Sequence, residues 1–122
     1  MEAMTNAVTV TLVSKKIVER GYDEKIAVVF GYKNNTSKDI SGVKGNIVVK
    51  DLFGDVISSF QVSNDDTIKA NESVTWKGER SIMFNFSNRD RKLVELSDDK
   101  YTVTWEPHII VFADGTQMKL PN

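Results

Sequence analysis

Residues 43–62 read VKGNIVVKDLFGDVISSFQV, and this stretch decides the fold of the 122-residue chain. Apolar and polar residues alternate on both sides of a break at residues 51–55, and a period of two is typical of strands that bury one face. The break reads DLFGD, in which Gly54 suits a tight turn because glycine adopts positive φ without strain. The stretch therefore predicts two antiparallel strands joined by a hairpin.

The same alternation continues along most of the chain. Further strands are expected at residues 8–12, 26–32, 74–76, 82–86, 101–112 and 116–120. Asp114-Gly115 predicts a two-residue type I′ hairpin, and Pro107 predicts a break or bulge inside the long strand at 101–112. Residues 88–96 predict a loop with one helical turn. Asn34 and Asn35 are expected to cap the loop that follows the strand at 26–32, and Ile40 is expected to be buried beneath that loop.

These elements predict a single all-β domain at residues 1–122, an immunoglobulin-like antiparallel β-sandwich of seven or eight strands. Residues 1–6 are expected to be disordered or to come from an expression vector, since they precede the first alternating run. A chain of this length buries roughly two thirds of the surface that its unfolded state exposes, so a hydrophobic core can stabilise it without disulfides or bound metal. That matters because the chain has no cysteine, which excludes disulfides and thiolate metal sites.

Composition argues against several classes of partner. Lys plus Arg total 16 and Asp plus Glu total 17, so the formal net charge is −1 and no basic patch predicts binding to nucleic acid or to an anionic membrane. No run reaches the about 18 apolar residues that a membrane span needs. The N-terminus lacks the pattern of a signal peptide, and the compartment stays open between cytosol and a segment whose leader was removed.

No catalytic residue or cofactor is predicted. His108 is the only histidine, and no serine lies in a Gly-x-Ser-x-Gly elbow. Three pairs of acids could be read as acid–base dyads: Asp65-Asp66, Asp98-Asp99, and Asp51 with Asp55. Neighbouring residues on a strand point to opposite faces, so solvated loop acids are the favoured interpretation, and a hydrolase remains a third alternative.

Two groups of residues are candidate binding sites. Asn64, Asp65 and Asp66 offer oxygen ligands for calcium, although no glycine follows at the sharp turn that calcium loops use. Trp76 and Trp105 are candidates for stacking on a sugar, while their places in alternating strands also suit a core.

One segment resembles a known family. Residues 30–57 read FGYKNNTSKDISGVKGNIVVKDLFGDVI, with a strand that ends in Gly-x-x-x-Asn, a polar loop, and a strand that stops at an Asp- and Gly-containing turn. This segment is similar to the centre of FxLYD-type domains, which are immunoglobulin-like modules of bacterial extracytoplasmic proteins, and residues 68–73 are similar to their next loop. The resemblance implies an extracytoplasmic interaction module and no enzyme activity.

The leading hypothesis is therefore a non-enzymatic binding or interaction module. It would present loop ends or a sheet edge to a protein or cell-envelope partner, because an unpaired edge invites strand addition. The alternative is a β-sandwich that binds carbohydrate, or another ligand with the help of calcium, through Trp76 or Trp105 and the acids at 65–66.

Overall fold

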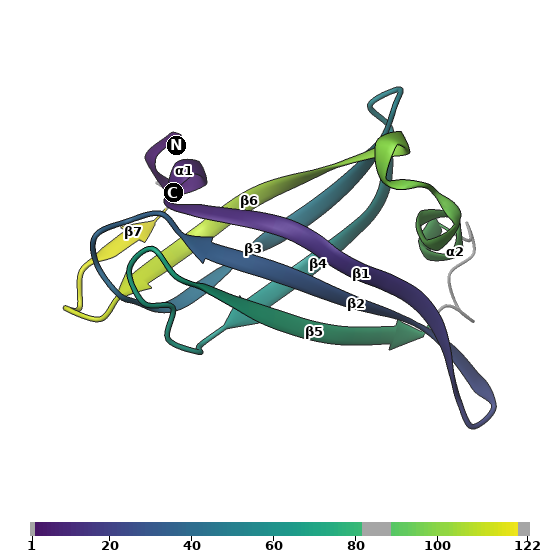
Figure 1. Ribbon diagram of the computed structural model, residues 1–122, viewed down its shortest axis with the longest axis horizontal. Coiled ribbons are helices and arrows are strands. Elements are labelled where there is room, and N and C mark those ends of the chain that lie inside the picture. Colours follow the sequence, from purple (N-terminus) through teal and green to yellow (C-terminus); the bar gives the residue numbers. More distant parts are fainter. Residues whose placement is uncertain (1, 82–88, 120–122) are drawn as a thin grey trace.

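The computed structural model describes residues 2–81 and 89–119, and its strands form two packed antiparallel sheets (Figure 1). The first sheet has the order β1-β2-β5 and consists of β1 (Val8–Arg20), β2 (Asp23–Asn34) and β5 (Ser73–Ser81). The second has the order β4-β3-β6-β7 and consists of β3 (Ile40–Asp51), β4 (Val56–Asn64), β6 (Tyr101–Phe112) and β7 (Gln117–Lys119). The predicted all-β immunoglobulin-like sandwich is confirmed, with seven strands in the described part of the chain.

The core lies between the sheets and follows the period of two. On β2 the alternate residues Ile26, Val28, Phe30 and Tyr32 are each at most 2 % exposed. Burying side chains of this size stabilises the fold by about 1.5–3 kcal/mol each. Phe30 also joins the two sheets directly, because its ring meets that of Phe60 edge to face at 5.3 Å between centroids.

Two hairpins share one turn design. Gly54 at φ +84° and Gly115 at φ +88° each close a three-residue loop, in which the amide of Asp51 donates to the carbonyl of Asp55 and that of Phe112 to Thr116. The predicted two-residue type I′ turn at Asp114-Gly115 was wrong. A type I′ turn needs positive φ at both central residues, and here only Gly115 has it.

The N-terminal residues correct a second expectation. Residues 2–7 form a helix, α1 (Glu2–Ala7), so the disorder predicted at residues 1–6 is wrong for residues 2–6, while their origin in an expression vector stays a prediction. Met4 and Ala7 are each 5 % exposed and belong to the core, while Asn35 donates from its backbone to the carbonyl of Ala7 and from its side chain to that of Asn6. Apolar anchoring of one face holds a helix that is too short to be stable alone.

The second helix is also longer than expected. α2 (Arg89–Glu95) makes two turns where one was predicted, and its Leu93 is fully buried; a 3₁₀ turn, η1 (Asp98–Lys100), leads from it into β6. Figure 1 shows α2 lying at one end of the sandwich, where it packs against β4, β1 and β2. Neither helix within residues 2–81 and 89–119 is long and apolar enough to cross a lipid bilayer.

Several local predictions are confirmed. Asn34 caps its loop by accepting from the amide and hydroxyl of Thr36, Ile40 is fully buried, and β6 bulges at His108 immediately after Pro107. The strand predicted at residues 82–86 lies outside the described residues, as do Asn88 and Leu120. β1 runs to Arg20, whereas the sequence predicted a strand only over residues 8–12.

Candidate functional site

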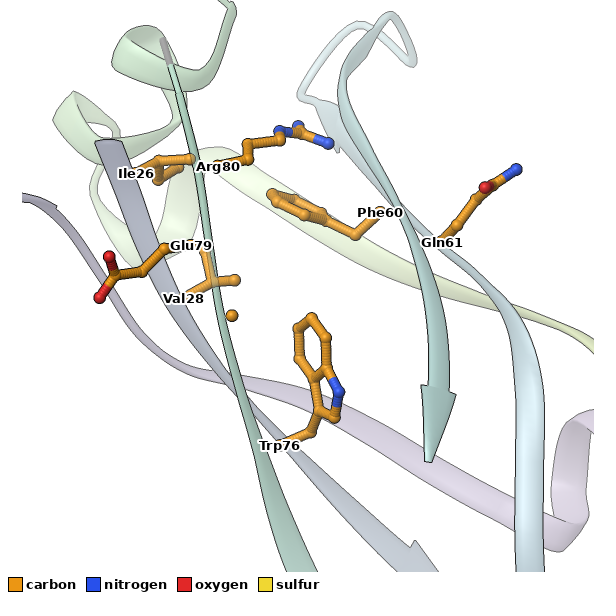
Figure 2. Close-up of a pocket in the computed structure, with 8 residues that line it drawn as sticks. Ile26, Val28, Phe60, Gln61, Trp76, Glu79 and Arg80 are labelled. Atoms are coloured by element: carbon orange, nitrogen blue, oxygen red, sulfur yellow. The ribbon is translucent and has the colours of Figure 1, made fainter. Parts of the chain in front are cut away.

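A small cavity opens between the edges of the two sheets, where β4 and β5 lie on the same side of the sandwich. Its volume is about 150 Å³, and it is called the slot below. Figure 2 shows side chains from β2, β4 and β5 converging on it, with Gln61 and Glu79 at the rim pointing away. The slot is lined by Ile26, Val28, Phe60, Gln61, Trp76, Gly78, Glu79 and Arg80.

Trp76 forms one wall of the slot because of the glycine two residues further along β5. A Cβ atom added at Gly78 would lie 2.4 Å from Cη2 of Trp76, so the indole occupies the space that a side chain there would fill. The inner side of the indole stacks on Phe30, with 6.0 Å between ring centroids and 28° between planes. Any side chain at residue 78 must therefore displace the wall of the slot.

Arg80 closes the end of the slot near α2. Its guanidinium binds the carboxylate of Asp90 through two contacts, Nε–Oδ2 and Nη2–Oδ1, both 2.6 Å long. It also donates to the carbonyl of Ser59 and lies 4.1 Å from the ring centroid of Phe60. Asp90 is 1 % exposed and also accepts from the hydroxyl of Ser58, so its charge is compensated by a planar bidentate partner.

The slot lies beneath an open sheet edge. β5 is the last strand of its sheet, and the backbone at this edge of Figure 1 has no further described strand beside it. In an immunoglobulin constant domain a fourth strand occupies that place in the four-stranded sheet. Because no strand of the described residues pairs with this edge, amide and carbonyl groups along β5 are directed outward, above an apolar cavity.

The rim of the slot is charged while its interior is apolar. Arg20 pairs with Glu79 at 2.7 Å on the outer face of the first sheet. The hydrogen bond from Arg20 lowers the pKa of Glu79, so this carboxylate stays ionised at neutral pH. An apolar group flanked by extended backbone fits such a site better than an ion does.

Of the two tryptophans predicted as stacking residues, only Trp76 borders a cavity. Trp105 is 7 % exposed, and it packs edge to face against Tyr32 and covers Gly45. This burial fits the alternative that Trp105 is a core residue, and it argues against stacking of a sugar on the indole.

Of the three predicted oxygen ligands, Asn64 already uses its side-chain oxygen within its own turn. Asn64 is 6 % exposed and turns its Oδ1 toward the amide of Asp66 in a local turn, while Asp65 and Asp66 are exposed. Asp51 accepts from the amides of Phe53 and Asp55 within its own hairpin. No group of three or more His, Asp or Glu residues in the described ranges could hold a metal ion.

Sequence reasoning missed the residues that shape the slot. The sequence patterns single out none of Phe60, Gly78, Arg80 and Asp90 as site residues. One signal was present in the sequence, a glycine two residues after Trp76 on the same face of a strand, which indicates that a ring covers that position. The pairing of Arg80 with Asp90 carries no comparable local signal.

Comparisons with known proteins bear only on the fold. No protein-family model matches the chain, and no match to a curated protein was found. A solved structural genomics target designated SoR45 is 14 % identical, with a TM-score of 0.51 over 94 % of this chain and 81 % of that one. A protein of Bordetella pertussis called ApaA is 11 % identical over 93 % of this chain and 86 % of that one, and its TM-score of 0.46 is too low to bear on fold or function. The likeness to SoR45 extends to the arrangement of the strands alone.

Proposed function

We propose that this chain is a non-enzymatic interaction module that binds an extended segment of a partner protein along the edge of β5. The segment continues the first sheet as a fourth strand, and one of its apolar side chains enters the slot between Phe60 and Trp76. Backbone pairing supplies affinity in such a mode, and the pocket for an alternate side chain supplies specificity.

The slot is the observation that carries this proposal. A cavity of about 150 Å³ has room for one medium-sized apolar side chain, and its interior consists of Ile26, Val28, Phe60 and Trp76. A pocket that adjoins outward-directed backbone groups is what strand addition requires. The polar groups around it are at the rim or, as with Arg80, already paired.

The hairpin tips are the competing surface. Phe53 is 88 % exposed and Leu52 is 60 % exposed, on the rigid turn that Asp51 holds together. A convex tip can insert into a pocket of another protein but cannot itself enclose a side chain. The edge of β5 is favoured because it combines a concavity with an extended backbone.

Selection from a library of displayed linear peptides tests the proposal. We expect the wild-type chain to enrich peptides with an apolar residue flanked by β-branched residues. Their binding should fall at least about tenfold in Trp76→Ala, which removes a wall of the slot, and in Val28→Phe, which fills it. Thr75→Ala, on the outer face of the same strand, is the matched control and should bind as the wild type does.

Two observables keep the test independent of folding. Near-ultraviolet circular dichroism and the urea midpoint report whether each variant is folded, and Val28→Phe is expected to remain folded because the slot offers it space. Peptides that bind both slot variants as tightly as the wild type would contradict the proposal, as would a library that yields no binder.

The resemblance to FxLYD-type domains supports a second part of the proposal, an extracytoplasmic location with a cell-envelope partner. It rests on the Asn34 loop and the Gly54 turn within residues 30–57. A fusion of the full gene product to alkaline phosphatase, which is active only outside the cytoplasm, tests it. An inactive but well-expressed fusion would count against this location.

A further inference from the structure

The four edge strands of the sandwich differ in how well they are protected against pairing. β1 has a register break between Leu12 and Ser14, and β7 has only three residues. On β4, the carbonyl of Ser59 already accepts from Arg80. Bulges, short length and inward-pointing charges are the ways in which edges avoid association. β5 differs from these strands, since its nine residues pair with β2 in an unbroken register and its one inward-pointing charge, Arg80, is compensated by Asp90.

The side chains of β5 fall into two sets. Thr75, Lys77 and Glu79 are exposed on the outer face, whereas Trp76, Gly78 and Arg80 are partly buried on the slot side. Lys77 and Glu79 carry opposite charges and flank Gly78 symmetrically. This symmetry matters because antiparallel pairing of a strand with its own copy places residues at equal distances from the centre opposite each other.

One register of two paired β5 strands avoids like charges opposite each other on both faces of the sheet. When two copies of β5 pair antiparallel about Gly78, Lys77 of each copy lies opposite Glu79 of the other, which gives two complementary charge pairs on the outer face. On the slot side, Trp76 of each copy lies opposite Arg80 of the other, whose charge is already compensated by Asp90, so no like charges meet there. Centring the pair on Lys77 or on Glu79 instead would place like charges directly opposite.

Gly78 also explains why the two copies of β5 can pack closely at the centre of the pair. Each indole already lies over its own Gly78, which means that it leans along the strand toward the centre of the pair. Two copies in this register would bring the two Trp76 rings side by side over a pair of glycines that present no side chain. The two slots would then lie next to each other beneath one continuous sheet.

We propose that the strand taken up at the β5 edge is β5 of a second copy of this chain, paired antiparallel about Gly78 in a two-fold dimer. This inference rests on the proposed addition of a strand at this edge and names that strand. The slot-side residues of the second copy are Trp76, Gly78 and Arg80, so packing of the two indoles over Gly78 takes the place of an apolar side chain inside the slot. The continuous sheet has six strands, three from each copy. Complementary charge, at Lys77 and Glu79, selects the register.

Charge exchange tests the register by sedimentation equilibrium. Lys77→Glu gives a strand with two carboxylates and Glu79→Lys a strand with two ammonium groups, so each variant alone should dimerise at least about tenfold more weakly than the wild type. Combined with Arg20→Ala, so that the lysine at residue 79 does not face Arg20, the double variant Lys77→Glu/Glu79→Lys restores both pairs and should dimerise to within about threefold of Arg20→Ala alone. An equimolar mixture of the two single variants should form a heterodimer, because each strand then complements the other.

Controls separate pairing from other effects of charge. Lys44→Glu makes the same charge change on β3 of the other sheet and should dimerise as the wild type does, and Arg20→Ala, which removes the partner of Glu79 within one copy, should not weaken the dimer. A dimer that the single variants do not weaken, or that the double variant fails to restore, overturns the proposal.

A chain that stays monomeric up to millimolar concentration also overturns self-pairing. It would leave the proposed function of the edge standing, provided that displayed peptides still bind in a manner that depends on Trp76. Loss of both the dimer and peptide binding would overturn the two proposals together. The two failures can therefore be told apart.

Discussion

At the scale of single residues, Tyr32 shows that the fold tolerates a buried hydroxyl group that makes no hydrogen bond. The phenol is fully buried, and its hydroxyl has no hydrogen-bond partner within the described part of the chain. Removing an unsatisfied polar atom while keeping the ring should cost nothing. We expect Tyr32→Phe to leave the free energy of unfolding unchanged or to raise it by up to about 1 kcal/mol in urea titrations. A loss of more than about 1 kcal/mol would reveal a hydrogen bond.

Tyr32 also makes the free energy of unfolding depend on pH in the alkaline range. Burial raises the pKa of Tyr32 above its ordinary value, so the native state holds this proton while the unfolded chain releases it. Stability is therefore complete below about pH 10 and falls as the pH rises further. Urea titrations from pH 8 to 11 should show a steeper fall for the wild type than for Tyr32→Phe. Equal slopes would mean that another group controls the alkaline limit.

Two ion pairs of β5 should differ sharply in their contribution. Arg80→Ala leaves the buried carboxylate of Asp90 without its guanidinium partner, and we expect a loss of about 2–3 kcal/mol, below the range for fully buried pairs because Arg80 is itself partly exposed. Arg20→Ala breaks the exposed pair with Glu79 and should change the urea midpoint little. Similar losses in the two variants would contradict the structural role assigned to Asp90.

At the scale of elements, the N-terminal helix is the clearest departure from expectation. If residues 2–7 pack as α1, then Met4→Ala opens a cavity in the core and should lower the free energy of unfolding by about 2 kcal/mol. Asn6→Ala, at an exposed position of the same short helix, is the control and should have little effect. A Met4→Ala variant as stable as the wild type would restore the idea that this segment does not contribute to the fold.

Strands were predictable where alternation and turn residues agree. β2, β3, β4 and β6 follow from the period of two, and the loop at Asn34 follows from the hydrogen bonds that its side chain can make. The far half of β1 was missed because Lys15, Lys16 and Glu19 interrupt the apolar pattern at an edge strand. α1 was missed because its stability comes from contacts with distant residues, and no local pattern records them.

At the scale of the whole molecule, the candidate site depends on the packing of two sheets. The sequence singles out Trp76, but the slot also needs Phe60 from the other sheet and the link between Arg80 and α2. These residues are brought together by the crossing of β4 and β5, which no spacing along the chain encodes. The site could therefore be predicted only in part, as one aromatic residue on one strand.

The central claim is that the edge of β5 receives another strand. Amide hydrogen exchange, followed residue by residue with and without a saturating peptide from the display selection, tests it most directly. The account predicts that the amides of residues 73–79 which do not bond to β2 become protected at least about tenfold, while β1 and the hairpin tip at Leu52 and Phe53 stay unchanged. Protection that appears at the hairpin tip or along β1, with the exchange of β5 unaltered, would contradict it.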